Sequence, residues 1–175
     1  MKILMIAGTL FFAANAFAET AQTAPNPMLD SSFKQATGSW TCKGTMKTPT
    51  GSQTEVKTTG KIAKALGGHQ YVGEFSYPKS DSFPAMKSIT EWHYDPTAKT
   101  LVANSVSDNG DASRGTSNGL QGQAMVWTSE GTMGGTQMKS RSTQLYKNDK
   151  EMTMSFEAEV GGNWTPVGQQ VCKKD

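Results

Sequence analysis

The feature that most constrains this chain is its pair of cysteines, Cys42 and Cys172, which lie near opposite ends of its 175 residues. A bond between them would make the first and last segments of the fold neighbours. In a chain built from successive β-strands, that adjacency is typical of a sheet rolled up until its two edges meet. The alternative is a pair of buried free thiols. An even cysteine count in an exported protein favours the bond.

The first residues have the pattern of a secretory signal peptide. Lys2 supplies a short positive region, residues 3–14 are uncharged and mostly apolar, and Ala16-Phe17-Ala18 offers the small residues that signal peptidase reads. Such a run of about a dozen apolar residues is too short for a membrane span, which needs about twenty. No cysteine follows the cut to carry a lipid. We therefore predict that residues 1–18 are removed and that a soluble chain without a stable membrane anchor is exported, to the periplasm or the medium.

The mature chain has the size of one domain, 175 − 18 = 157 residues. Residues 19–29 lack periodic apolar positions and are predicted to be a disordered leader. The domain is then predicted to span residues 30–175. The formal charge of the whole chain is only +2, its basic residues are spread among acids, and Lys173-Lys174 is predicted to be a solvated tail. Nucleic-acid binding needs clustered lysine and arginine, so no nucleic-acid partner is expected.

One short helix is predicted. Residues 28–36 can form one or two helical turns, with Asp30 or Ser31 as the N-cap and Gly38 beyond the end.

After Gly38, apolar residues recur at every second position, which is typical of half-buried β-strands. Residues 152–160 are the clearest case, and turns such as Asp108-Asn109-Gly110-Asp111 separate the runs as tight hairpins require. The runs predict about ten strands, which begin near residues 38, 53, 69, 85, 99, 112, 123, 136, 151 and 164.

Ten short antiparallel strands with almost no helix fit either a closed up-and-down barrel or a two-sheet sandwich. Short connections favour the barrel. In a barrel of this kind the first strand pairs with the last, and the cysteines lie on those two strands. We therefore predict an all-β, closed antiparallel up-and-down barrel with a short N-terminal helix and a disulfide across its seam.

Several segments also share their order with one bacterial protein family. They are Gly38-Ser-Trp-Thr-Cys-Lys-Gly44, residues 69–74, Tyr94-Asp-Pro96, residues 125–131, residues 150–154, and Asn163-Trp-Thr-Pro-Val-Gly168 with Cys172. Over roughly residues 30–175 the chain resembles the exported family catalogued as domain of unknown function 1579. The resemblance implies a fold similar to the calycin (lipocalin-like) and nitrobindin-like barrels, whose first strand carries Gly-x-Trp. It implies no activity.

Catalytic and metal-binding motifs are weak. Gly115-Thr116-Ser117-Asn118-Gly119 matches a nucleophile elbow, but an elbow needs a helix after its turn, and the polar flanks predict a strand end and a hairpin loop. Zinc needs three or four ligands, and the two histidines, His69 and His93, are 24 positions apart. Nitrobindin-like relatives hold haem through a histidine, yet no motif assigns that role to either histidine here. We expect no cofactor and no metal.

Two arginines, Arg114 and Arg141, stand among many lysines. A lone arginine can mark a place that needs its planar guanidinium. We predict that Arg141 or Arg114 packs over the ring of Trp40 as a cation–π pair. The alternative is a solvent-facing arginine on an exposed strand face.

The interior supplies aromatic and thioether surface suited to an apolar pocket. The candidate lumen residues are Trp40, Tyr71, Phe75, Trp92, Met125, Trp127, Arg141, Met152, Met154 and Phe156. The leading hypothesis is a non-enzymatic exported barrel that binds a small apolar or amphipathic ligand. The alternative is a structural or interaction protein of the bacterial envelope with a side-chain-filled barrel, and a haem-binding or hydrolytic enzyme ranks last. Ligand identity and oligomeric state stay open.

Overall fold

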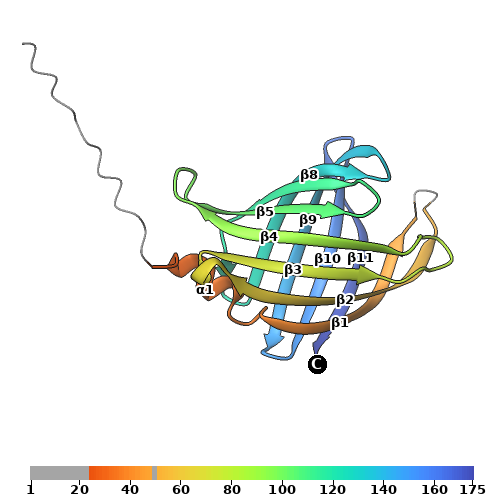
Figure 1. Ribbon diagram of the computed structural model, residues 1–175. Coiled ribbons are helices and arrows are strands. Elements are labelled where there is room, and N and C mark those ends of the chain that lie inside the picture. The colour runs from red at the N-terminus through yellow and green to blue at the C-terminus, as the bar shows by residue number, and fades with distance from the viewer. Residues whose placement is uncertain (1–23, 49–50) are drawn as a thin grey trace, which may run out of the picture.

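The computed structural model describes residues 24–48 and 51–175 (Figure 1). The predicted signal peptide, residues 1–18, and the predicted leader as far as residue 23 lie outside the described residues. The elements follow one another in the order α1 (Pro27–Phe33), β1 (Gly38–Lys47), β2 (Gln53–Ala65), the 3-10 turn η1 (Leu66–Gly68), β3 (Gln70–Tyr77), β4 (Met86–Asp95), β5 (Thr100–Ser107), β6 (Ala112–Ser117), β7 (Leu120–Gln121), β8 (Ala124–Met133), β9 (Thr136–Asn148), β10 (Glu151–Val160) and β11 (Asn163–Lys174).

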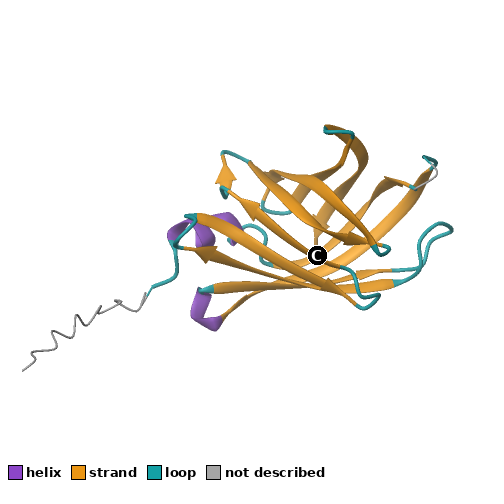
Figure 2. Ribbon diagram, turned by 90° about the horizontal axis from the view of Figure 1, so that it is seen from above, coloured by secondary structure: helices purple, strands orange, loops and turns teal. Residues whose placement is uncertain are grey.

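Ten of the strands close into an antiparallel barrel. Neighbours in sequence pair with each other, β1 pairs with β11, and β6 pairs with β8, which completes the ring. The two-residue strand β7 pairs only with β8. The predicted closed up-and-down barrel is confirmed, and its ten strands begin within one residue of the predicted positions. In Figure 2, which views the molecule from above Figure 1, the two helical segments lie on the same side of the barrel.

Period-two alternation divides each strand between an inner and an outer face. On β8, for example, Met125 and Trp127 are buried while Val126 and Thr128 are exposed. Residues opposite each other in adjacent strands share a face, so the strand registers extend this assignment around the barrel. We call the two faces the inner face and the outer face.

Helix α1 covers one end of the barrel. Its N-cap is Asn26, whose side chain accepts a hydrogen bond from the backbone N–H of Met28 at 2.9 Å, and Pro27 occupies the first turn. The prediction of Asp30 or Ser31 as N-cap was wrong, because Asn26 and Pro27 already start the helix about one turn earlier. No helix in the described part of the chain is long and apolar enough to cross a membrane.

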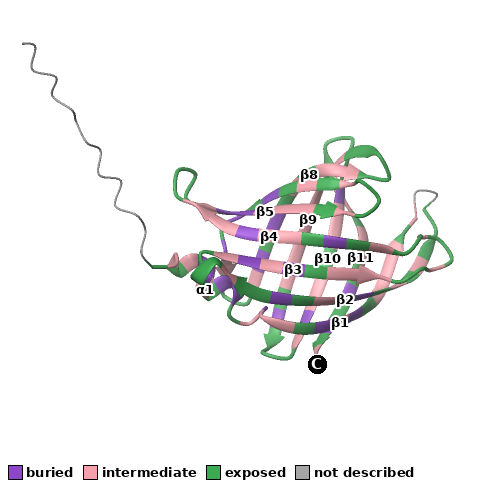
Figure 3. Ribbon diagram, viewed as in Figure 1, coloured by how far each residue is buried: buried purple, intermediate pink, exposed green. Residues whose placement is uncertain are grey.

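The hydrophobic core gathers beside α1, where buried segments of several strands meet the helix (Figure 3). It contains Leu29 and Phe33 of α1 together with inner-face residues of the strands. The opposite end of the barrel carries the β1–β2, β3–β4, β5–β6, β8–β9 and β10–β11 connections. The barrel therefore has a closed end at α1 and a far end formed by hairpin loops.

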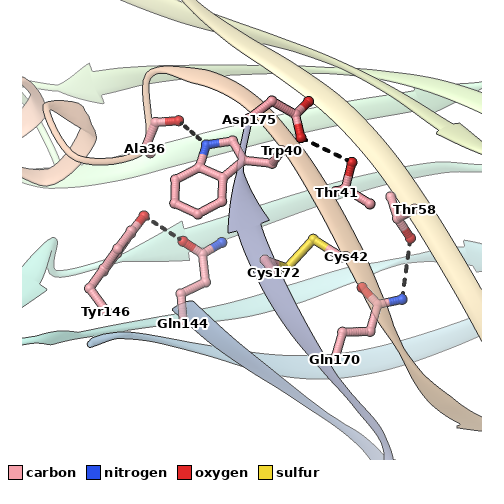
Figure 4. The surroundings of a disulfide bond; sticks show 10 residues. All are labelled: Ala36, Trp40, Thr41, Cys42, Thr58, Gln144, Tyr146, Gln170, Cys172 and Asp175. Atoms are coloured by element: carbon pink, nitrogen blue, oxygen red, sulfur yellow. Dashed lines mark hydrogen bonds between the residues drawn. A yellow bond between two sulfur atoms is a disulfide. The ribbon is translucent and has the colours of Figure 1, made fainter. Parts of the chain in front are cut away.

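The predicted disulfide is confirmed. Cys42 of β1 and Cys172 of β11 are partners in the strand register and form a disulfide across the seam (Figure 4). Both side chains are buried, on the same inner face as Trp40. No free cysteine occurs in the described residues.

Candidate functional site

The floor of the lumen is an aromatic cluster built around one helical side chain. Phe33 is 2% exposed, and its ring centre lies 4.9 Å from that of Tyr71, 5.1 Å from that of Trp92 and 6.4 Å from that of Trp127. These rings come from α1, β3, β4 and β8. The helix therefore closes this end of the barrel by inserting Phe33 among rings from three strands.

Polar contacts hold the helix on the barrel. Asp30 accepts hydrogen bonds from Lys64 Nζ at 2.5 Å and from Tyr71 Oη at 3.0 Å, and Ser32 Oγ accepts one from the backbone N–H of Leu120 at 3.0 Å. The hydrogen bond from Lys64 is the main reason that the pKa of Asp30 lies below its ordinary value. Burial, and then the hydrogen bond to Asp30, raise the pKa of Tyr71.

Most of the predicted lumen residues lie in or against this floor. Six of them are buried core residues, and Phe75 and Met154 are partly buried against the same cluster. Their role as ligand contacts stays a prediction. The six are Trp40, Tyr71, Trp92, Met125, Trp127 and Met152. Phe156 is half-buried at the far end of the inner face.

Arg141 is on the outer face, so its assignment to the lumen was wrong. It lies opposite Thr128 of β8, which is exposed, and opposite Glu157 of β10. Its Nε donates to Glu157 Oε2 at 2.6 Å, and its guanidinium carbon lies 4.9 Å from the centre of the Trp164 ring. Glu157 and Trp164 thus supply the anion and the aromatic face that this guanidinium contacts.

Neither Arg114 nor Arg141 lies over the ring of Trp40, and a lysine takes that place. Lys174 lies opposite Trp40 in the β1–β11 register, and its Nζ is 5.2 Å from the centre of the Trp40 ring. The same Nζ donates a hydrogen bond to the backbone carbonyl of Gln35 at 3.0 Å. Trp40 Nε1 donates one to the backbone carbonyl of Ala36 at 2.7 Å. Lys174 is therefore part of the closed end rather than of a solvated tail. Arg114 is exposed on β6.

Above the floor, the inner face contains two sectors. On β4, β5, β6, β8 and β9 it carries mainly small hydroxyl side chains, which we call the hydroxyl sector, although Met86 and Met138 also lie on the inner face of these strands. On β1, β2, β3 and β10 it carries mainly larger apolar side chains, which we call the apolar sector, although Thr54 and Thr58 of β2 also lie on the inner face. The hydroxyl sector consists of Ser88, Thr90, Ser105, Ser107, Ser113, Ser129, Ser140 and Ser142. The apolar sector consists of Met46, Val56, Phe75, Tyr77, Met154 and Phe156.

Solvent reaches both sectors. Apart from Ser88, every residue of the two sectors has intermediate exposure, although all of them are on the inner face. In a barrel filled by side chains these positions would be buried, as the floor residues are. The half of the lumen away from α1 is therefore open.

The polar groups of the inner face are partly paired with one another. Thr90 Oγ1 donates to Ser105 Oγ at 3.0 Å, and Gln170 Nε2 donates to Thr58 Oγ1 at 3.2 Å (Figure 4). Trp127 differs from them, because its buried Nε1 has no hydrogen-bond partner among the described residues. A buried donor left unpaired costs about 1–3 kcal/mol.

Two depressions lie at the far end of the barrel. One has a volume of about 380 Å³ and includes Tyr77 and Met86 in its lining. The other has a volume of about 340 Å³ and includes Phe156 and Gly168. Both combine these inner-face residues with outer-face residues such as Lys57 and Gln169, so they lie over the rim.

The residues of the candidate catalytic and metal-binding motifs do not come together in the lumen. Ser117 ends β6, and its Oγ accepts a hydrogen bond from the backbone N–H of Gly119 at 3.1 Å, so the elbow-like motif is a strand end followed by a loop, as predicted. His69 is exposed beside η1, and His93 lies on the outer face of β4. In the described residues no three His, Cys, Asp or Glu side chains are grouped as a metal site would require.

Sequence reasoning missed the hydroxyl sector. Ser88 and Thr90, and likewise Ser105 and Ser107, are two positions apart, so each pair shares a strand face. That spacing was a usable signal. The predicted lumen residues were mostly aromatic residues and methionines, whereas the open part of the lumen is lined by small hydroxyl residues as well.

No protein-family model and no curated protein matches the sequence. Among solved structures, the crystal structure of Rv2717c from M. tuberculosis superposes with a TM-score of 0.66 at 12% identity, covering 87% of this chain and 99% of that one. The S-type phycobiliprotein lyase CPES from Guillardia theta superposes with a TM-score of 0.53 at 8% identity, covering 83% and 92%. At such identities the likeness shows the fold alone. The chain has a lipocalin-like β-barrel fold.

Proposed function

We propose that this protein is an exported, non-catalytic binding protein that holds a small apolar or amphipathic molecule in the open half of its barrel. The observation that carries the proposal is the intermediate exposure of inner-face residues such as Ser142, Met154 and Phe156. A molecule placed there would be enclosed by the barrel wall and would rest on the aromatic floor. Burial of its apolar surface would drive binding.

Export is supported by two independent features. The disulfide between Cys42 and Cys172 persists best in an oxidising compartment. The signal-peptide pattern predicted for residues 1–18 agrees with that environment.

Native mass spectrometry of protein purified from its own compartment tests the proposal directly. We expect a bound mass that leaves on denaturation. In parallel, the delipidated protein should take up a fluorescent fatty-acid-like probe. The proposal would be contradicted if the purified protein carried no bound mass and bound none of the apolar fluorescent probes.

A matched pair of variants on β9 locates the probe. Ser142 is on the inner face and its neighbour Thr143 is on the outer face. Ser142→Phe fills lumen space and should weaken probe binding about tenfold or more, whereas Thr143→Phe should leave it unchanged. Near-ultraviolet circular dichroism checks that both variants fold, and Ser140→Phe repeats the test one inner position away.

The second candidate is a non-catalytic interaction protein of the bacterial envelope. Ile89 of β4 and Val106 of β5 lie opposite each other on the outer face and are 51% and 58% exposed. Paired exposed apolar residues can serve protein contacts. Under this candidate the lumen takes up no probe, and the double variant Ile89→Ser/Val106→Ser loses a partner that cross-linking detects with the wild-type protein.

A further inference from the structure

We infer that the ligand of this lumen is an uncharged amphipathic molecule, with hydroxyl or carbonyl groups along one side and apolar surface along the other. The inference rests on the proposed function and specifies the chemical class of ligand at that site. Three observations carry it: the composition of the hydroxyl sector, the position of the apolar sector and the unpaired donor of Trp127.

The hydroxyl sector is continuous across adjacent strands. Thr90 of β4 lies opposite Ser105 of β5, which lies opposite Ser113 of β6, and Ser129 of β8 lies opposite Ser140 of β9. In the β6–β8 pairing Ser113 lies opposite Gly131 and Ser129 lies opposite Gly115, so the two groups meet diagonally across glycines. Each hydroxyl can both donate and accept a hydrogen bond, so the surface suits ligand groups that do the same.

The inner face offers no counter-charge to an ionised ligand in its open half. Among described inner-face positions, the charged residues are Lys64 and Lys174. Both lie at the closed end, where Lys64 contacts Asp30 and Lys174 contacts the carbonyl of Gln35. A carboxylate or ammonium group carried into the open half would lose part of its hydration to the barrel wall without gaining an opposite charge, which disfavours charged ligands.

The apolar sector lies across the lumen from the hydroxyl sector. In the ring order β6-β5-β4-β3-β2-β1-β11-β10-β9-β8, strands β1, β2, β3 and β10 lie five places away from β6, β8, β9 and β4 in turn, and therefore across the lumen from them. Phe75 belongs to this sector, and a Cβ added at Gly73 would lie 2.7 Å from its ring. The ring therefore lies against the bare backbone of its own strand and meets Trp92 edge-on, with 6.2 Å between the ring centres, so it offers apolar surface on this side of the lumen.

Trp127 adds a directed donor at the base of the hydroxyl sector. Its side chain is 4% exposed on the inner face of β8, opposite Ser142, and its Nε1 has no partner in the described part of the chain. Buried donors in folded proteins are almost always paired. A hydroxyl or carbonyl oxygen of the ligand is the acceptor that the site lacks.

The test compares three probes that share one twelve-carbon chain and differ in the head group: neutral 1-lauroylglycerol, anionic laurate and cationic dodecyltrimethylammonium. Each probe is kept below its own critical micelle concentration and is titrated by calorimetry into the mature, disulfide-bonded protein. We expect 1-lauroylglycerol to bind about tenfold or more tightly than either charged probe. Equal or tighter binding of a charged probe overturns the inference and leaves the proposed function standing. No binding of any probe overturns both.

Three variants identify the groups that make the distinction. Thr90→Val, Ser105→Ala and Trp127→Phe each remove one donor from the inner face and should weaken 1-lauroylglycerol about three- to tenfold. Thr116→Val, on the exposed outer face of β6, is the control and should change nothing. Near-ultraviolet circular dichroism verifies the fold of each variant. If both Thr90→Val and Ser105→Ala keep the wild-type affinity, the hydroxyl sector does not contact the ligand and the inference is wrong.

Discussion

Cys42 lies directly opposite Cys172 across the β1–β11 seam, and their disulfide joins the first and last strands of the barrel from the inside. The bond closes a loop of 130 residues. A cross-link over so long a loop restricts the unfolded chain strongly. The seam is thus held by strand hydrogen bonds and by a covalent link on the lumen side.

Removal of this link should destabilise the fold without opening the ring. The double variant Cys42→Ala/Cys172→Ala is expected to lower the free energy of unfolding by at most about 4 to 5 kcal/mol, because the unfolded chain regains loop entropy. Urea denaturation measures the loss. Reductant should bring the wild-type protein to the same stability and should not affect the double variant. An unchanged free energy of unfolding would contradict this account of the seam.

The aromatic floor should depend on Phe33. Phe33→Ala removes a buried ring from contact with Tyr71 and Trp92 and is expected to lower the free energy of unfolding by about 3–5 kcal/mol. The near-ultraviolet circular dichroism of the neighbouring rings should fall as well. Ser31→Ala, at an exposed position of the same helix, is the control and should cost less than about 0.5 kcal/mol. Equal effects of the two variants would mean that α1 does not close the barrel as described.

Acid should weaken the attachment of α1. Hydrogen bonds from Lys64 and Tyr71 hold the pKa of Asp30 below its ordinary value of 3.8. A carboxyl group whose pKa is lowered on folding contributes stability above its unfolded pKa, and this stability is lost as the pH falls through the folded pKa. The pair is half-exposed, so the effect should stay below about 1 kcal/mol.

Chemical denaturation at successive pH values checks this expectation. Between about pH 5 and pH 2 the wild-type protein should lose more stability than Asp30→Asn, which has no such carboxylate to protonate. Asp149→Asn, in the exposed β9–β10 turn, should follow the wild-type curve. Parallel curves for the wild-type protein and Asp30→Asn would rule out the contribution of Asp30.

Alkali should also destabilise the barrel. Burial raises the pKa of Tyr146 to about 12 and raises the pKa of Tyr77, and burial with the Asp30 contact raises that of Tyr71. Because unfolded tyrosines ionise at about 10, the unfolded state releases protons first, and stability falls as the pH rises above 10. Tyrosinate absorbance near 295 nm follows the ionisation. In the titration curve of Tyr146→Phe, one ionisation step at high pH should be missing. Simultaneous ionisation of all four tyrosines near pH 10 in a protein that is still folded would contradict the prediction.

Local sequence pattern was sufficient for the strands. Period-two alternation and turn residues depend on neighbours in sequence, which is why the ten strands begin within one residue of their predicted positions. The helix was placed less well, since its start depends on Asn26 and Pro27, which were assigned to the leader. The cation over Trp40 was misassigned for a different reason. The partner across the seam is Lys174, and only the β1–β11 register brings it there.

The sequence by itself determined the class of fold, the strand positions and the pairing of Cys42 with Cys172, because alternation is a local property and two cysteines allow one disulfide. The tertiary structure decided which side chains share the lumen. Met46 and Ser113 lie across the lumen from each other only because the ring closes through β6 and β8. Arg141 points outward for the same kind of reason, since its face follows from the residues opposite it on β8 and β10. Contacts between strands far apart in sequence are set by closure and register, which no short stretch of sequence encodes.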